Sequence, residues 1–286
     1  MSVIILFQVI TNGLVNGLIY ALMAAGFSMI YGQANILFFA IGEIYMLGAV
    51  LTYTLMVFAG LPYFIALAIS VFVLGLFGVI LQKYFFHYLE GENPLSFAFA
   101  SLALGMLIVG IALEIFGEQG KAIEAPLSGV LNIFGIILPK DKLMLIIIAL
   151  LIIFALKYFL KLTKIGRGIR AVSQDEEGAR LVGVPVGYTK RLTFFLSLAT
   201  AAAGGGLIAP VFYVDVFMGS PVLMKTLTVV VLGGLGSFSG AIVGGLFIGL
   251  VESFGYTFLG GITTLASFII VMIVLVLKPA GLFGYE

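Results

Sequence analysis

Long apolar segments recur along the whole chain and limit what it can fold into. Of its 286 residues, 62% are hydrophobic and 9% are charged. A bilayer core about 30 Å thick takes about 20 apolar residues per helical span. Segments of this kind lie at about 8–31, 35–59, 62–84, 95–117, 142–160, 191–213, 238–258 and 262–278. They predict an all-α, polytopic membrane bundle that forms a single domain, 1–286.

Two interruptions in this pattern predict broken or re-entrant helices. A further apolar segment, at about 221–235, is short and glycine-interrupted, which is typical of a half-helix or a re-entrant segment. The predicted number of membrane crossings is therefore eight or nine. A polar run at 31–35 separates the first two long segments. Unwound backbone at membrane depth is tolerated only against protein or a water-filled cavity. Asn35, in this run, is therefore a candidate for lining a translocation pathway.

Basic residues concentrate in one loop. The run 157–191 holds eight of the fourteen Lys and Arg residues. Because basic loops resist translocation, this loop is predicted to face the cytoplasm. The loop 118–141 then lies outside, and a chain with nine crossings begins outside and ends inside. If 221–235 turns back instead, the C-terminus changes sides.

The stretch 173–183 inside this loop carries the signals of a short helix. Ser173 and Glu176 fit a capping box, and Glu176 and Arg180 are an i,i+4 pair. Gly183 is placed to end the helix. Together these signals predict a helix of about nine residues.

The same helix is a candidate docking surface. Asp175 and Glu177 complement the positive end of the helix dipole. Gly178, Ala179 and Val182 fall on one side and make a smooth face that another protein could approach closely. The alternative is a solvated interfacial helix that covers the end of the bundle and binds no partner.

Five ionisable residues lie inside or at the edges of apolar windows. They are Glu43, Glu114, Asp215, Lys225 and Glu252. A charge near the bilayer centre is unfavourable by a few kcal/mol, so such residues usually face a cavity or a partner. Asp215 and Lys225 flank a predicted extracellular turn and are expected to reach the interface, while Glu114 is close to a helix end.

Glu43 and Glu252 lie deeper in their windows and are candidates for the translocation pathway. For Glu43 the alternative is a structural hydrogen bond to the broken segment at Asn35. For Glu252 a structural role is favoured over a place in the pathway.

Glycines repeat near the end of the chain at four-residue spacing. The series consists of Gly236, Gly240 and Gly244, followed by Gly245 and Gly249. Small residues at this spacing let the backbones of membrane helices approach closely. We expect these glycines to pack helices and to contact no substrate.

Several classes of function lack the residues that they need. The net charge is +1 and the basic cluster lies beside the membrane, which argues against nucleic acid as a partner. There is no Cys and one His, His87, so thiolate and histidine metal sites are excluded. Gly120 and Lys121 do not form a phosphate-binding loop, because Ala122 follows and the first glycine is missing. We expect no metal, cofactor or catalytic residue in this chain.

Parts of the sequence resemble a known family. Glu177-Gly178-Ala179, followed by three residues and Gly183, resembles the EAA loop of ATP-binding-cassette importer permeases, with Gly where the middle Ala usually stands. Nearly the whole chain is similar to the branched-chain amino acid permease family, the shorter of its two permease types. The runs that carry this similarity are Asn16–Leu22, Ala40–Ala49, Gly168–Val172, Gly233–Ser237 and Lys278–Gly284.

The resemblance implies a permease subunit of an importer in the inner (cytoplasmic) membrane of a prokaryote, surrounded by lipid. Its implied partners are a second, homologous permease, two cytoplasmic ATP-binding subunits that use ATP and Mg, and an extracytoplasmic binding protein. The implied substrate is a branched-chain or related amino acid. The coupling loop 161–190 would contact the ATPase through Ser173, Asp175, Glu176, Glu177, Gly178, Ala179 and Gly183.

Three alternatives stay open. In a gradient-driven transporter that works as a single subunit, Glu43 or Glu252 would bind a proton or a sodium ion. An ATP-driven importer of the same class could carry urea or a short amide, because no residue discriminates among these ligands. A membrane-embedded enzyme or scaffold would move no ligand in any combination of subunits.

Overall fold

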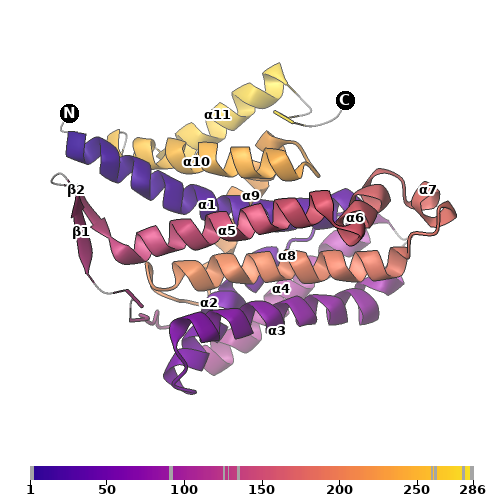
Figure 1. Ribbon diagram of the computed structural model, residues 1–286, viewed down its shortest axis with the longest axis horizontal. Helices are drawn as coiled ribbons and strands as arrows, with labels where there is room; N and C mark the ends of the chain where they lie inside the picture. The colour runs from indigo at the N-terminus through magenta and orange to yellow at the C-terminus, as the bar shows by residue number, and fades with distance from the viewer. Residues whose placement is uncertain are drawn as a thin grey trace.

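The computed structural model is a helical bundle in which most long helices lie along one direction (Figure 1). It describes residues 3–89, 93–124, 126–127, 129–133, 136–258, 260, 263–278 and 281–283. One end, here named the hairpin end, carries a β-hairpin and the N-terminus, and the opposite end is named the α7 end. The elements are α1 (Val3–Ala34), α2 (Ile41–Val57), α3 (Tyr63–Tyr84), η1 (Phe86–Leu89), α4 (Pro94–Phe116), β1 (Val130–Ile133), β2 (Ile136–Pro139), α5 (Lys140–Leu162), α6 (Lys164–Gln174), α7 (Glu176–Leu181), α8 (Val186–Ile208), α9 (Gly219–Gly233), α10 (Phe238–Phe258) and α11 (Thr263–Leu277).

The helix lengths confirm a polytopic helical membrane protein. Within the described residues, six helices are long and apolar enough to cross a membrane, namely α1, α3, α4, α5, α8 and α10. The apolar helices α2 and α9 are shorter, with 17 and 15 residues. At 1.5 Å per residue α9 is about 22 Å long, which is less than the thickness of the hydrocarbon core. The all-α description needs one addition, because β1 and β2 pair antiparallel inside the 118–141 loop.

Helix α1 lies at the centre and packs most extensively on α10. The close approach depends on glycine: an ideal Cβ on Gly245 would lie 2.6 Å from the Ala21 amide nitrogen, and one on Gly249 would overlap the backbone of Gly17. Backbone contact of this kind replaces the side-chain packing that holds soluble bundles together. The α1–α10 pair is therefore a closely packed part of the frame around the cavity.

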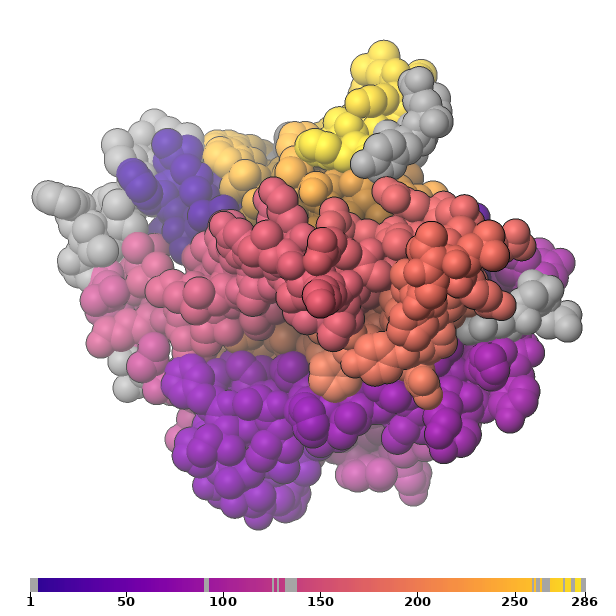
Figure 2. Space-filling model, turned by 45° about the vertical axis from the view of Figure 1, so that its right-hand side comes forward, coloured from indigo at the N-terminus to yellow at the C-terminus, as the bar shows by residue number. Residues whose placement is uncertain are grey.

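Helices α3, α4 and α5 lie around this centre and expose large apolar side chains. Phe72 on α3, Met106 on α4 and Leu151 on α5 are each more than half exposed. The purple surface of α3 along the lower part of Figure 2 belongs to this apolar exterior. Lipid tails are as apolar as these side chains, so this surface fits contact with lipid or with another membrane-embedded chain.

The chain unwinds between α1 and α2, but at 35–40 and not at the predicted 31–35, because residues 31–34 still belong to α1. Asn35 follows the last residue of α1 with a left-handed φ of 54°, and its amide donates to the Tyr31 carbonyl at 2.7 Å. Helix α2 begins at Ile41, so the predicted segment 35–59 starts six residues too early. The polar, left-handed position stops the helix before the apolar residues resume.

The start of α9 lies against the start of α2. An ideal Cβ on Gly219 would be 2.5 Å from the Gly42 carbonyl oxygen. Between α8 and α9 the chain pairs with the loop after α4, because Lys121 and Val214 exchange backbone hydrogen bonds of 2.9 and 2.8 Å. The helices that correspond to the predicted segments 35–59 and 221–235 therefore contact each other inside the bundle.

Residues near the C-terminus cap α9. The Leu282 amide donates to the Leu232 carbonyl at 2.8 Å, and the Phe283 amide donates to the Gly233 carbonyl at 3.0 Å. The last carbonyls of a helix have no partner within the helix itself. Two of the runs that carried the family resemblance are thus joined here, although Pro279, Ala280 and Gly284 lie outside the described residues.

Candidate functional site

A cavity of about 520 Å³ opens between α1, α9, α10 and the chain that links α8 to α9. Small-molecule sites have volumes of about 300–1,000 Å³ and combine apolar walls with a few polar groups. Its lining residues are Asn16, Ile19, Tyr20, Tyr45, Ile208, Phe212, Tyr213, Asp215, Met218, Pro221, Val222, Lys225, Glu252 and Tyr256. The cavity matches both criteria, because its charged residues are few and its other walls are largely apolar or aromatic.

A buried ion pair forms one wall of this cavity. Lys225 on α9 donates from Nζ to Glu252 Oε1 on α10, and Tyr20 on α1 donates from Oη to Glu252 Oε2 at 2.8 Å. The Glu252 side chain is 2% exposed and that of Lys225 is 15% exposed. An unpaired charge at this depth would be strongly unfavourable. Lys225 and Glu252 can therefore both be buried because they neutralise each other.

The prediction that Lys225 reaches the interface was wrong. Its side chain turns inward and pairs with Glu252, a partner 27 positions away along the chain. Asp215 lines the same cavity, and its Oδ1 accepts a hydrogen bond of 2.7 Å from the Phe217 amide. Sequence reasoning therefore missed Lys225 and Tyr20; the available signal was a lone Lys and a lone Glu in neighbouring apolar segments.

A second cavity of about 330 Å³ adjoins the first. Both are lined by Asn16, Phe212 and Tyr256. Lys142, at the start of α5, donates from Nζ to Asn12 Oδ1 at 2.8 Å beside the second cavity. The pair of cavities leads from the Lys225–Glu252 pair toward the hairpin end.

The three predicted pathway residues do not come together. Glu252 lines the large cavity, whereas Glu43 is buried on α2 with its carboxylate toward α4, where an ideal Cβ on Gly105 would be 3.3 Å from Oε2. Asn35 is exposed in the break after α1, and the described hydrogen bonds include none between it and Glu43. Glu43 and Asn35 therefore do not share the Glu252 cavity.

The predicted coupling loop folds as two helices, α6 and α7, joined at Asp175. The Asp175 Oδ1 accepts a hydrogen bond of 3.0 Å from the Gly178 amide and caps α7. Ser173 lies in the last turn of α6, where its hydroxyl donates to the Arg170 carbonyl at 2.9 Å. The predicted capping box is therefore wrong: the true cap lies two residues later, and α7 has six residues instead of about nine.

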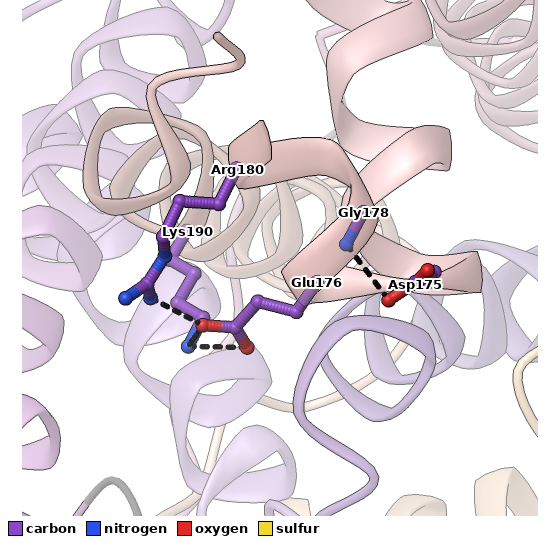
Figure 3. A network of polar contacts seen from close by, with 5 residues as sticks. All are labelled: Asp175, Glu176, Gly178, Arg180 and Lys190. Atoms are coloured by element: carbon purple, nitrogen blue, oxygen red, sulfur yellow. Dashed lines mark hydrogen bonds and ion pairs between the residues drawn. The ribbon is translucent and has the colours of Figure 1, made fainter. Parts of the chain in front are cut away.

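Glu176 holds α7 against the bundle (Figure 3). Its Oε1 lies 3.1 Å from Arg180 Nη2, which is the i,i+4 pair predicted, and its Oε2 lies 2.9 Å from Lys190 Nζ on α8. Arg180 is a solvent-facing side chain, while Lys190 is largely buried. The contact with Lys190 therefore connects α7 to the start of α8.

The exposed face of α7 differs from the predicted one. Ala179 is buried and packs with Val172 and Val186, so it belongs to the inner face of α7. Leu181 and Val182 are 88% and 79% exposed at the end of the helix. Glu177 is exposed as well, while Gly178 is half-buried beside the Asp175 carboxylate. Gly183 ends this region with a φ of 83°.

The glycine series lies between helices except at its first member. Gly240 and Gly244 pack on α9, where an ideal Cβ on Gly244 would be 2.9 Å from the Val229 carbonyl oxygen, and Gly245 and Gly249 pack on α1. Gly236 was wrongly placed on the same helix: it precedes α10, in the α9–α10 turn, with a φ of 79°. The described residues contain no cluster of three acidic or histidine side chains suited to a metal ion.

Comparison with known proteins identifies the family. A family model described as "Branched-chain amino acid transport system / permease component" matches residues 9–277. The chain is 28% identical over 292 residues to the high-affinity branched-chain amino acid transport system permease protein BraD of Pseudomonas aeruginosa, covering 97% of this chain and 95% of that protein. It is 26% identical over 299 residues to the corresponding permease protein LivH of Escherichia coli K12, with the same two coverages of 97% and 95%.

A solved structure, PsaBC from Streptococcus pneumoniae in complex with Fab, is similar over 95% of this chain and 92% of that chain, with 16% identity and a TM-score of 0.49. The family match covers all the residues that line the large cavity. This chain therefore belongs to the family of permease components of branched-chain amino acid transport systems.

Proposed function

We propose that this chain is the permease subunit of an ATP-binding-cassette importer that carries branched-chain amino acids across the cytoplasmic membrane of a prokaryote. The family match and relatives named as branched-chain amino acid permeases support the substrate class. The observation that carries the proposal is the cavity of about 520 Å³ between α1, α9 and α10, which combines apolar walls with a few charged groups.

Transport proceeds by alternating access in this proposal. An extracytoplasmic binding protein delivers the amino acid at the hairpin end, and the ligand passes the second cavity to reach the Lys225–Glu252 pair. The α7 end then lies in the cytoplasm, in agreement with the basic run 157–191. A second, homologous permease and lipid cover the exposed apolar faces of α3, α4 and α5.

Two cytoplasmic ATP-binding subunits, which bind ATP and Mg, drive the cycle through α7. Leu181 and Val182 offer them an exposed apolar contact. The Glu176–Lys190 pair ties α7 to α8, a helix of 23 residues that ends at Ile208 in the wall of the cavity. A displacement of α7 is passed along α8 as along a rigid element, which connects ATP binding to the shape of the cavity.

Reconstitution tests this function directly. The chain is assembled in proteoliposomes with the second permease, the ATP-binding subunits and the binding protein from the same gene cluster, and uptake of labelled leucine is followed with and without ATP. We expect uptake that requires ATP and every subunit. Uptake by this chain alone, driven by a proton or sodium gradient, would replace the proposal by a gradient-driven transporter. The pairing of Glu252 with Lys225 speaks against Glu252 as the ion site of such a transporter, because Lys225 already neutralises that carboxylate.

A further inference from the structure

We propose that Lys225 and Glu252 form the site in the permease that holds the two charged ends of a zwitterionic amino acid. This inference rests on the transport function proposed above and adds the residues that select the ligand inside the membrane. In the absence of ligand the two side chains neutralise each other. When an amino acid enters, its carboxylate takes the place of Glu252 beside Lys225, and its ammonium group pairs with the carboxylate released.

The geometry places this pair where a ligand can reach it. Three helices meet at the Glu252 carboxylate: Lys225 comes from α9, Tyr20 from α1 and Glu252 itself from α10. All three residues line the cavity of about 520 Å³. An ammonium group has three N–H donors, and among the described residues Glu252 is the hydrogen-bond acceptor of Lys225. These donors become available to a ligand carboxylate when it displaces Glu252.

The cavity contains charges of both signs, which suits a ligand that carries both signs. Lys225 contributes a positive charge, and Glu252 and Asp215 contribute negative charges. Separating Lys225 from Glu252 without compensation would leave two charges unpaired in a poorly solvated place. A zwitterion supplies a partner for each of them. Urea or a neutral amide supplies neither full charge, so it cannot open the pair at comparable cost.

The apolar residues that line the cavity suit an aliphatic side chain. Ile19, Ile208, Met218 and Val222 line the same cavity as the ion pair. An amino acid held at its charged end by Lys225 and Glu252 can therefore bury an apolar side chain against these residues, which stabilises the bound state through the hydrophobic effect. The cavity therefore offers both charged partners and apolar contacts, which are the two kinds of contact that an apolar amino acid needs.

A purely structural ion pair makes a different prediction. Buried pairs that only hold helices together can often be replaced by apolar residues of similar volume with little loss of stability, or with a gain. The double variant Lys225→Met/Glu252→Leu makes this replacement. If the pair binds the ligand, the double variant assembles and docks its partners but loses recognition of the amino acid.

The experiment uses the absence of cysteine from the natural chain. Val222→Cys places one thiol in the wall of the cavity, and the assembled complex in nanodiscs is labelled with a small maleimide without binding protein. Leucine, leucinamide (which lacks the carboxylate) and 4-methylpentanoate (which lacks the ammonium group) are compared as protecting ligands. We expect saturating leucine to slow labelling about tenfold and each analogue to slow it less than about twofold, because each lacks one ionic contact.

The same labelling experiment is repeated with Lys225→Met/Glu252→Leu added to Val222→Cys. Leucine should no longer protect the thiol in this variant. The matched control Glu114→Gln changes an exposed carboxylate on α4 and should retain protection by leucine. Equal protection by leucine and 4-methylpentanoate, or full protection in the double variant, would overturn the inference. If the double variant does not assemble, the comparison of the three ligands on the Val222→Cys complex decides. Failure of the importer function would show separately, as absent ATP-driven leucine uptake by the unmodified complex.

Discussion

Glu176 and Lys190 form an ion pair of 2.9 Å that joins α7 to the first turns of α8. The same carboxylate also contacts Arg180, whose side chain is 70% exposed. Glu176 is therefore shared between an inner partner, which connects two helices, and an outer partner on its own helix. The difference between the two contacts allows the coupling role of α7 to be tested.

Replacing Lys190 by Met should weaken coupling. The pair is partly exposed, so we expect the free energy of unfolding to fall by about 1 kcal/mol or less, while leucine uptake per ATP hydrolysed falls severalfold because α7 is no longer tied to α8. The measurement is ATPase activity and uptake in the same proteoliposomes. Arg180→Met is the matched control and should leave the leucine uptake per ATP hydrolysed unchanged. An equal effect of both variants would show that the α7–α8 link does not contribute to coupling.

Replacing Gly183 by Val should also disturb the α7 region. The φ of Gly183 is 83°, a conformation that is unfavourable for a β-branched residue by roughly 1–2 kcal/mol. We expect normal membrane insertion and reduced binding of the ATP-binding subunits, measured by co-purification. Gly187→Val is the control, because Gly187 is in α8, has open space around its Cα and has no positive φ. Unchanged co-purification of the Gly183 variant would argue against docking at α7.

Replacing Gly249 by Leu should separate α1 from α10. A side chain there overlaps the backbone of Gly17 and needs a shift of one whole helix. Overpacking of this kind destabilises by roughly 1–3 kcal/mol or more, which thermal unfolding of the detergent-solubilised protein would report as a lower Tm. Gly110→Leu on α4 is the control, since an ideal Cβ on Gly110 would meet no neighbouring helix within 4 Å among the described residues. A similar Tm for both variants would contradict the packing described for α1 and α10.

Replacing Glu43 by Gln should have little effect on transport. The carboxylate of Glu43 is directed toward Gly105 of α4 and does not line the cavity that contains Glu252. We therefore expect leucine uptake within about twofold of the unmodified complex, a difference well below 1 kcal/mol. A loss of about tenfold or more would place Glu43 on the pathway, as its position in the sequence first suggested.

The sequence predicted well where a property depends on local composition. The membrane class, the apolar helices and the short segment at 221–235 follow from the lengths of apolar runs, because a bilayer needs a fixed length of helix. A break after the first helix was also predicted, although it lies at 35–40 and not at 31–35. The Glu176–Arg180 contact was also predictable, since residues four apart on a helix are neighbours. The cap of α7 was not, because Ser173 and Asp175 are both good capping residues and the end of α6 decided between them.

What the sequence by itself determined is that this protein crosses a membrane and belongs, by its motifs, with permeases. What the tertiary structure alone decided is which charges meet. Lys225 and Glu252 lie 27 residues apart, and Tyr20 lies 232 residues from Glu252, so no local pattern links them. Their contact depends on the close approach of α1 to α10, which the glycines permit, and on the placement of α9 beside them. Because the protein interior solvates charges poorly, Lys225 or Glu252 would be strongly unfavourable there without its partner.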